Sequence, residues 1–286
     1  MSIIRKIPWI RQPTVRTGIN WGNPLTHGLV ALWNAAEGGG DQPDLSTRTV
    51  YGGRGAAFAS DTLITHVEFN EAWKPQLNSG LLGYRPTNDA NVTFLDVVFG
   101  ATVQSTADKT LFSLNQFHNS AEDSAIWGSP FSASFQIWAD TASGALRLNI
   151  YDGVTVSSSS AGLLDDNNRV YQITITYDDS ASDCLAYVDG IQEVSDTGFT
   201  PATNADDLRI NTSESTSKSG DHSIYMLAIW DRVLTVGEVF ALNKNPWQLF
   251  QPRLQYVPTE VVAVGGTTPH YAFGLPLYGP FAGPIG

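Results

Sequence analysis

The sequence predicts an all-β protein built as an antiparallel β-sandwich, and three observations support this prediction. Apolar and polar residues alternate with a period of two along several short segments, as expected for half-buried strands. Asp-Gly pairs and clusters of Ser, Thr and Asn separate these segments, and such residues are typical of tight turns. Only 15% of the 286 residues are charged and 42% are hydrophobic, which is enough for a sizeable core. Many short strands at regular spacing favour a sandwich.

The clearest strands are predicted within residues 145–179. Alternation along 170–179 would place four side chains on one face: Tyr171, Ile173, Ile175 and Tyr177. Alternation along 145–156 does the same for Leu146, Leu148 and Ile150. Further strands are predicted within 94–103, 109–116, 133–140, 207–213 and 223–231.

Two Asp-Gly pairs are predicted to close hairpins. Asp189-Gly190 stands between two extended segments, and a two-residue type I′ turn needs a positive φ at both positions, which Asp tolerates and Gly adopts freely. Asp152-Gly153 is predicted to form a second hairpin turn of the same kind. We interpret both pairs as turn chemistry and not as active-site residues.

One short helix is predicted near the C-terminus, within residues 232–247. Thr235 and Glu238 have the spacing of a capping box, in which each side chain bonds to the other residue's backbone N–H. Pro246 is expected to stop the helix shortly afterwards. Three apolar residues would share the face that packs on the sandwich: Leu234, Val239 and Leu242.

The chain is predicted to have three zones. Residues 1–24 form a basic extended arm, because no acidic residue precedes Glu37 and several basic ones do. Residues 25–255 form the sandwich, and 256–286 form a tail of Gly, Pro and aromatic residues that cannot build a core alone. We expect the two arms to join subunits into a homo-oligomer, and flexible termini without a partner are the alternative. The expected assembly residues are Trp9, Arg11, Tyr271, Phe273, Tyr278 and Phe281.

Composition argues against several functions. A formal net charge of −12 disfavours nucleic-acid binding, which relies on clustered Lys and Arg. No apolar stretch is long enough for a membrane span, and charge and proline interrupt the first ten residues before a signal sequence could form. Cys184 is the single cysteine, so no intrachain disulfide forms, and its apolar neighbours predict a core residue in preference to a catalytic thiol.

Several stretches resemble laminin-G-like domains of the concanavalin A-like lectin/glucanase family. "TYDD", "AYVDG" and "DRVLTVGEV" match the strand, hairpin and helix start of the second half of such domains, and "GLVALWNAAEGGG" matches their first strand and loop. The resemblance covers about residues 23–250, although Thr47 replaces a glycine that is usual in the family. It implies a jelly-roll sandwich.

The ends of this region, including "NPWQLF", look most like the version of the domain found in virion proteins of tailed bacteriophages. That resemblance implies a non-enzymatic structural protein of the virion: a head decoration, tail or fibre component. The same fold also hosts lectins and enzymes, so fold alone does not decide the function.

Enzyme chemistry is not expected. The glucanase branch of the family carries its acids as Glu-x-Asp-x-Glu on one strand, and this chain lacks that triplet; its acidic pairs are adjacent residues that would face opposite sides of a strand. The five histidines have no ligand-like spacing. No cofactor is expected, and calcium on loop carboxylates is left open. The loop carboxylates concerned are Asp41, Asp44, Asp178, Asp179 and Asp221.

The alternative to a virion structural protein is a carbohydrate-binding module that recognises host-surface glycans. Such a module needs exposed aromatic rings that stack on sugar faces, together with polar side chains that reach hydroxyls. The candidate rings are Trp73, Trp127, Trp138 and Tyr84, and each competes with a plain role in the core.

Overall fold

The computed structural model describes much of the chain in fourteen segments and divides it into two compact units. The described residues are 3–7, 12–13, 17–34, 40–43, 66–69, 73–78, 81–86, 95–97, 108–118, 124–128, 136–142, 145–201, 208–210 and 222–257. One unit comprises residues 1–7 and 254–286, and its described part is a two-stranded sheet of β1 (Ile3–Ile7) and β18 (Arg253–Val257). The other unit, residues 8–253, holds the remaining elements.

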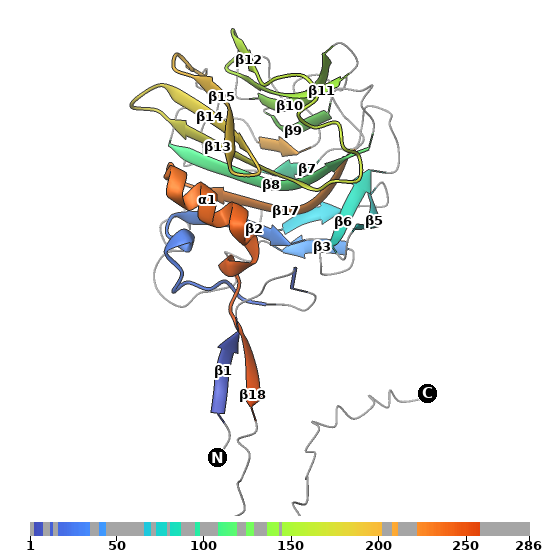
Figure 1. Ribbon diagram of the computed structural model, residues 1–286, viewed down its shortest axis with the longest axis vertical. Helices are drawn as coiled ribbons and strands as arrows, with labels where there is room; N and C mark the ends of the chain where they lie inside the picture. The colour runs from blue at the N-terminus through green and yellow to red at the C-terminus, as the bar shows by residue number, and fades with distance from the viewer. Residues whose placement is uncertain are drawn as a thin grey trace, which may run out of the picture. The chain divides into compact units, whose positions relative to one another are not determined.

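The larger sheet of this second unit has eight strands among the described residues (Figure 1). Along the sheet the order is β15 (Ile191–Asp196), β14 (Asp183–Val188), β13 (Tyr171–Asp178), β8 (Lys109–Phe117), β17 (His222–Trp230), β6 (Leu81–Pro86) and β5 (Trp73–Asn78), and β2 (Leu29–Asn34) also pairs with β17. Every assigned pair is antiparallel.

The smaller sheet has six strands among the described residues. Its order is β12 (Val156–Ser158), β11 (Ala145–Tyr151), β10 (Gln136–Ala142), β9 (Ser124–Gly128), β16 (Leu208–Ile210) and β7 (Leu95–Val97). A further antiparallel pair joins β3 (Gly40–Pro43) to β4 (His66–Phe69). The all-β, two-sheet antiparallel architecture with one short helix confirms the predicted fold class.

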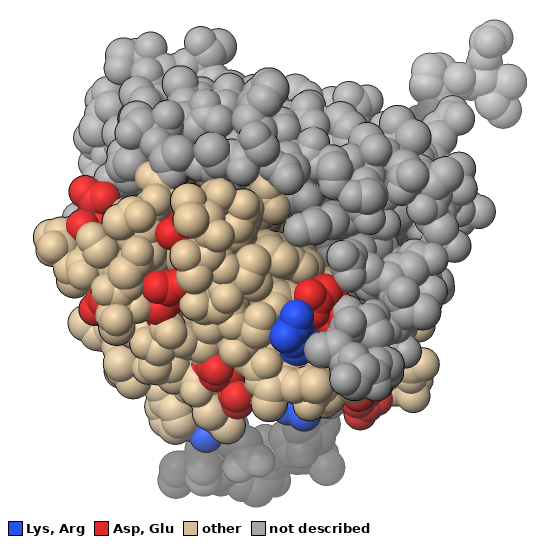
Figure 2. All heavy atoms as spheres, turned by 90° about the horizontal axis from the view of Figure 1, so that it is seen from above, with Lys and Arg blue, Asp and Glu red and all other residues tan. Residues whose placement is uncertain are grey.

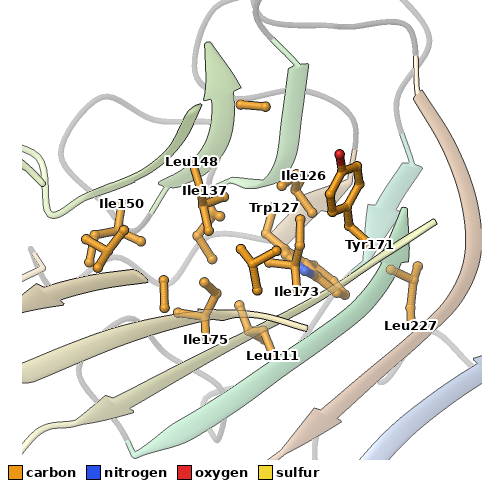
Figure 3. Close-up of a cluster of buried hydrophobic side chains, with 14 of the residues drawn as sticks. Leu111, Ile126, Trp127, Ile137, Leu148, Ile150, Tyr171, Ile173, Ile175 and Leu227 are labelled. Carbon is orange, nitrogen blue, oxygen red and sulfur yellow. The ribbon is translucent and has the colours of Figure 1, made fainter. Parts of the chain in front are cut away.

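The main core lies between the two sheets (Figure 3). Alternation directs one face of each strand inward, so Ile173 and Ile175 of β13 meet Leu148 and Ile150 of β11. All seven residues predicted to share strand faces are in this cluster, where Tyr177 packs beside Phe199.

Cys184 belongs to the same core and is fully buried. Burial in these apolar surroundings raises the pKa of its thiol, because the thiolate would lose its hydration. Cys184 is therefore held as a neutral thiol, which confirms the prediction of a core residue.

The large sheet is also covered on its outer face, and this second cover includes the predicted helix. α1 (Val236–Lys244) and the 3-10 turns η1 (Pro24–Thr26) and η7 (Pro246–Leu249) pack there. Leu234, Val239 and Leu242 are buried against the sheet, as the helix pattern predicts. No helix of the described residues has the length and hydrophobicity to cross a membrane.

Residues 17–24, which the sequence analysis places in the N-terminal arm, contribute to this cover. Ile19 is fully buried and forms a β-bridge with Phe250, and the backbone N–H of Asn20 donates to the Leu249 carbonyl at 2.7 Å. The arm boundary at residue 24 stays a prediction, as do the assembly residues of both arms, all of which lie outside the described residues.

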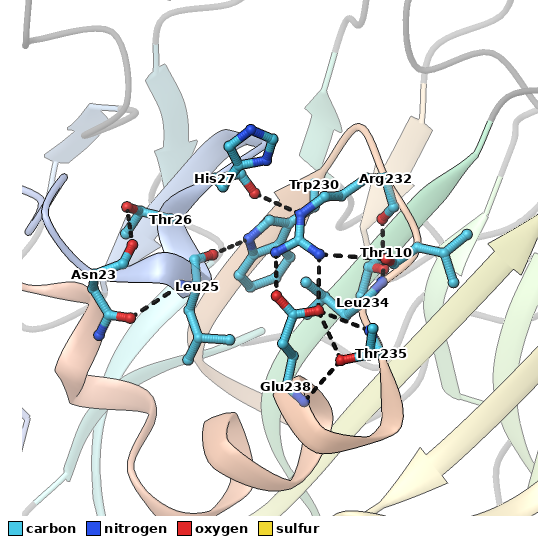
Figure 4. Close-up of polar contacts among 11 residues, drawn as sticks. Asn23, Leu25, Thr26, His27, Thr110, Trp230, Arg232, Leu234, Thr235 and Glu238 are labelled. Carbon is cyan, nitrogen blue, oxygen red and sulfur yellow. Dashed lines mark hydrogen bonds and ion pairs between the residues drawn. The ribbon is translucent and has the colours of Figure 1, made fainter.

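A network of hydrogen bonds holds the start of α1 against the sheet (Figure 4). The predicted capping box is present, with Thr235 accepting from the Glu238 backbone N–H and the Glu238 carboxylate accepting from that of Thr235. Arg232 forms two hydrogen bonds to Glu238, at 2.6 and 2.9 Å, and donates to the His27 carbonyl at 2.7 Å. The indole of Trp230 donates to the Leu25 carbonyl at 2.6 Å. This network therefore links the start of the helix to residues 25–27.

The two Asp-Gly turns differ. Asp189 and Gly190 have φ values of 52° and 81° and connect β14 directly to β15, which confirms the two-residue hairpin. The prediction for Asp152-Gly153 is wrong in its turn type: four residues connect β11 to β12, and positive φ occurs at Gly153 but not at Asp152. The Asp152 carboxylate instead accepts from the backbone N–H groups of Val154 and Thr155, which stabilises a longer loop.

We predict that Glu238→Gln keeps the capping box and loses only the charge interaction with Arg232. Hydrogen bonding to Arg232 lowers the pKa of Glu238 from 4.5 to about 2, so the native state favours the carboxylate. This stabilisation is complete above pH 4.5 and is lost as the pH falls towards 2. The variant should lose about 1 kcal/mol of unfolding free energy at pH 7.

Denaturant unfolding between pH 2 and pH 7 measures this effect. The difference between wild type and variant should shrink as the pH falls. Glu193→Gln on β15 is the control, since Glu193 has no ion pair among the described residues. A difference that stays constant over this pH range would contradict the role of the charge.

Candidate ligand-binding site

A hollow of about 330 Å³ opens between the outer face of the large sheet and the segment that joins α1 to η7. This volume lies within the range of about 300–1,000 Å³ that is usual for small-molecule sites. Its wall combines apolar side chains with carboxamides, one ammonium group and one indole: Leu81, Leu114, Val170, Gln172, Asn243, Lys244, Asn245, Pro246 and Trp247.

The floor of the hollow comes from two neighbouring strands. Gln172 of β13 stands directly opposite Leu114 of β8 in the antiparallel register, so both side chains emerge on the outer face. Gln172 Nε2 donates to the Asn243 carbonyl at 2.9 Å and thereby attaches the end of α1 to the sheet. Its Oε1 atom is buried and has no hydrogen-bond partner. Leaving a buried acceptor unsatisfied costs about 1–3 kcal/mol, so a donor that reached this atom would be stabilising.

The end of α1 forms the opposite wall. Asn245 ends the helix, where its backbone N–H donates to Ala241, and its side-chain Oδ1 accepts from the Trp247 N–H at 3.1 Å to begin η7. Pro246 occupies the first position of η7, where its missing N–H costs nothing. Trp247 is 6% exposed and packs beside Phe250, so only a small part of its indole reaches the hollow.

The Asp189-Gly190 hairpin supports this wall from behind. The Asp189 backbone N–H donates to the Gln172 carbonyl at 2.8 Å, and the Asp189 carboxylate accepts from the Gln172 N–H at 2.9 Å and pairs with Arg169. The side chain of Asn243 lies against Gly190, close enough that a Cβ there would lie 2.8 Å from Asn243 Nδ2. Asp189 is therefore a positioning residue for Gln172.

Among the described residues that line the hollow, none carries a side chain typical of acid–base or nucleophilic catalysis: there is no carboxylate, histidine, cysteine or hydroxyl group. Glycoside hydrolysis, for example, commonly uses a pair of carboxyl groups on the two sides of the bond that breaks. Carboxamides, an ammonium group and an indole edge can instead orient a polar ligand through hydrogen bonds and ring contacts.

Two of the four aromatic residues considered as sugar platforms are buried and do not line this hollow. Trp127 is fully buried and Trp138 is 5% exposed, so neither presents an open ring face. The side chains of Trp73 and Tyr84 lie outside the described residues, as do the six assembly residues, so their roles stay predictions.

Of the acidic residues considered for calcium, Asp41 lies in strand β3 and not in the predicted loop, Asp178 and Asp179 take part in a turn, and Asp44 and Asp221 lie outside the described residues. Asp178 accepts from Ser180 and Ala181, and Asp179 accepts from the Tyr177 hydroxyl. Within the described residues, no group of three His, Cys, Asp or Glu side chains has metal-binding geometry. Calcium binding elsewhere in the chain stays a prediction.

Sequence reasoning missed the residues that line the hollow. In the sequence, Gln172 is recognisable only as one of the polar residues that alternate with apolar ones along 170–179. "NKNPW", residues 243–247, was interpreted as a helix stop. Two asparagines, a lysine and a tryptophan directly after an amphipathic helix are a signal that could have drawn attention to this end of α1.

Comparison with known proteins shows the fold and not the function. No protein-family model matches the chain, and no curated protein matches it significantly. Among solved structures, the binding domain of Paraclostridial Mosquitocidal Protein 1 is similar, with a TM-score of 0.57 and 14% identity over 77% of this chain and 52% of that one. The other similar structures are also matched over only part of their length.

Two further similar structures are a binding domain in complex with a sialic acid and a sialidase. The ligand-binding domain of botulinum neurotoxin serotype D, in complex with N-acetylneuraminic acid, matches with a TM-score of 0.53 and 10% identity over 76% of this chain and 50% of that one. Trypanosoma rangeli sialidase matches with a TM-score of 0.52 and 13% identity over 76% of this chain and 33% of that one. The chain thus spans about half of the toxin domains and a third of the sialidase.

We predict that Gly190→Ala disturbs both the hairpin and the wall of the hollow. Its φ of 81° strains any residue with a Cβ, and the added methyl group would collide with Asn243. The expected loss is about 1 kcal/mol or more of unfolding free energy. Gly198→Ala is the matched control, because the nearest atom to its Cβ would be 4.0 Å away. Equal melting temperatures for the two variants would contradict this account.

Proposed function

We propose that this protein is a non-enzymatic saccharide-binding module that uses the hollow beside α1. The observation that carries the proposal is a ligand-sized hollow whose described lining residues include two asparagines, a glutamine, a lysine and a tryptophan, and no acid–base pair. Sugar recognition needs donors and acceptors for hydroxyl groups together with an apolar surface for the ring. Asn243, Asn245 and Gln172 provide the former, and Val170, Leu114 and the indole of Trp247 provide the latter.

The unsatisfied oxygen of Gln172 adds to this argument. A sugar hydroxyl both donates and accepts a hydrogen bond, so a hydroxyl in the hollow could donate to Gln172 Oε1 after a small shift of that side chain. This hydrogen bond would satisfy an acceptor that has no partner in the folded chain. An apolar ligand would leave this oxygen unsatisfied, so the site favours a ligand rich in hydroxyl or N–H groups.

The structural neighbours support a binding role by analogy. Two of them are described as binding domains, and one was solved with a bound sugar. Their low sequence identity limits this support to the shared sandwich, so the proposal depends on the hollow itself.

A virion setting remains part of the proposal as the place where the module would act. It rests on the resemblance of residues 231–250 to phage virion domains and on the aromatic tail, and it includes assembly into a homo-oligomer through the arms. A saccharide-binding module that is carried on a virion and recognises host-surface glycans would combine the two hypotheses drawn from the sequence, the virion protein and the carbohydrate-binding module.

We predict that the full chain binds a subset of saccharides on a glycan array and that Val170→Phe abolishes this binding. Val170 lines the hollow, and a phenyl ring would occupy its volume. Val154→Phe is the matched control, because Val154 is 87% exposed on the loop between β11 and β12 and is not among the residues that line the hollow.

Calorimetric titration with the best array ligand measures the loss, and circular dichroism checks that both variants fold. Binding that survives in folded Val170→Phe would place the site elsewhere. A flat array with the folded wild-type chain would reject saccharide binding.

A further inference from the structure

Among the described residues that line the hollow, Lys244 alone has an ionisable side chain. It is exposed at the last turn of α1, and its ammonium lies 4.8 Å from the centroid of the Phe240 ring, one helical turn earlier. Within the described residues no carboxylate pairs with it, whereas Arg147, Arg169 and Arg232 each pair with an acid. Lys244 is thus a cation beside the hollow that has no carboxylate partner in the described part of the chain.

This arrangement contrasts with the charge of the whole chain. The formal net charge is −12, and acidic side chains are spread over the described surface seen in Figure 2, with few basic ones among them. An acidic protein offers many carboxylates that could neutralise a lysine, yet the described lining of the hollow includes none. The local charge of the site therefore has the opposite sign to that of the molecule, which favours an anionic ligand there.

The contact with Phe240 fixes where this charge sits. A cation over an aromatic face gains about 0.5–1 kcal/mol at an exposed site, which favours one position of a flexible side chain. Phe240 is 53% exposed, so its packing alone does not explain its presence on the open side of α1. Together Phe240 and Lys244 form an apolar and cationic rim.

We propose that the hollow binds an acidic saccharide whose carboxylate faces the Lys244 ammonium at the rim. This inference rests on the proposed function and deepens it by naming the ligand class. The sugar hydroxyl or acetamido groups bind among Gln172, Asn243 and Asn245, and the carboxylate points outward to Lys244. Sialic acids and uronic acids share this chemistry, and the experiment separates them.

The test compares each acidic sugar with its own methyl ester, which keeps the shape and removes the charge. Binding of N-acetylneuraminic acid and of glucuronic acid to the full chain is measured by calorimetry at low and high salt. The acid that fits should bind on the order of fivefold more tightly than its ester at low salt. The preference should narrow at high salt, because the ion pair at the rim is screened.

Three variants locate the effect. Lys244→Met should bind acid and ester equally, and Lys244→Arg should keep the preference because it keeps the charge. Ser160→Glu, at an exposed position outside the lining, changes the net charge by the same amount as Lys244→Met and should keep the preference. Both methionine and arginine are good helix formers, so α1 is preserved.

The outcomes separate this inference from the proposed function. Equal binding of acid and ester by the wild-type chain, or a preference that persists in Lys244→Met, would overturn the charge assignment. If neutral sugars alone bind and Val170→Phe still abolishes their binding, the saccharide site stands and the acidic class is wrong. If no sugar binds, both proposals fail.

Discussion

Burial of the large sheet on both faces is the constraint on which the rest of the structure depends. The inner face packs on the smaller sheet, and the outer face carries a second apolar set that includes Phe112, Leu114 and Trp230. These side chains would be exposed without the cover made by residues 19–26, α1 and η7. The hydrogen bonds of Arg232 to Glu238 and to the His27 carbonyl hold that cover in place.

The hollow is a consequence of this cover, because α1 and η7 leave part of the outer face open beside Leu114 and Gln172. The end of the helix and the Asp189 hairpin are joined there by hydrogen bonds to the side chain and the backbone of Gln172. The elements that hold the site therefore also stabilise the fold. Such a site is preorganised, which reduces the entropy that a ligand must lose on binding.

The sequence predicts the strands, the hairpin at Asp189-Gly190 and the capped helix well, because each depends on local periodicity or on a few neighbouring residues. It fails at Asp152, where the carboxylate accepts from Val154, Thr155 and Thr200 and stabilises a four-residue loop. It also fails to find the hollow, since Gln172 and Asn243 are 71 residues apart and meet only after the sheet and its cover have formed. The sequence also does not reveal that Trp127 and Trp138 are buried and so present no open face to a sugar, because exposure is a property of the tertiary structure.

The most direct test of this account is a titration of the isotope-labelled full chain with saccharides, followed through side-chain amide and indole N–H signals by NMR. The account predicts that the signals of Gln172, Asn243, Asn245 and Trp247 shift together with one saturation curve. The Asn149 amide, which is buried on the smaller sheet, should not shift. Saturable shifts at Asn149 and Trp138 with none around the hollow would contradict the account.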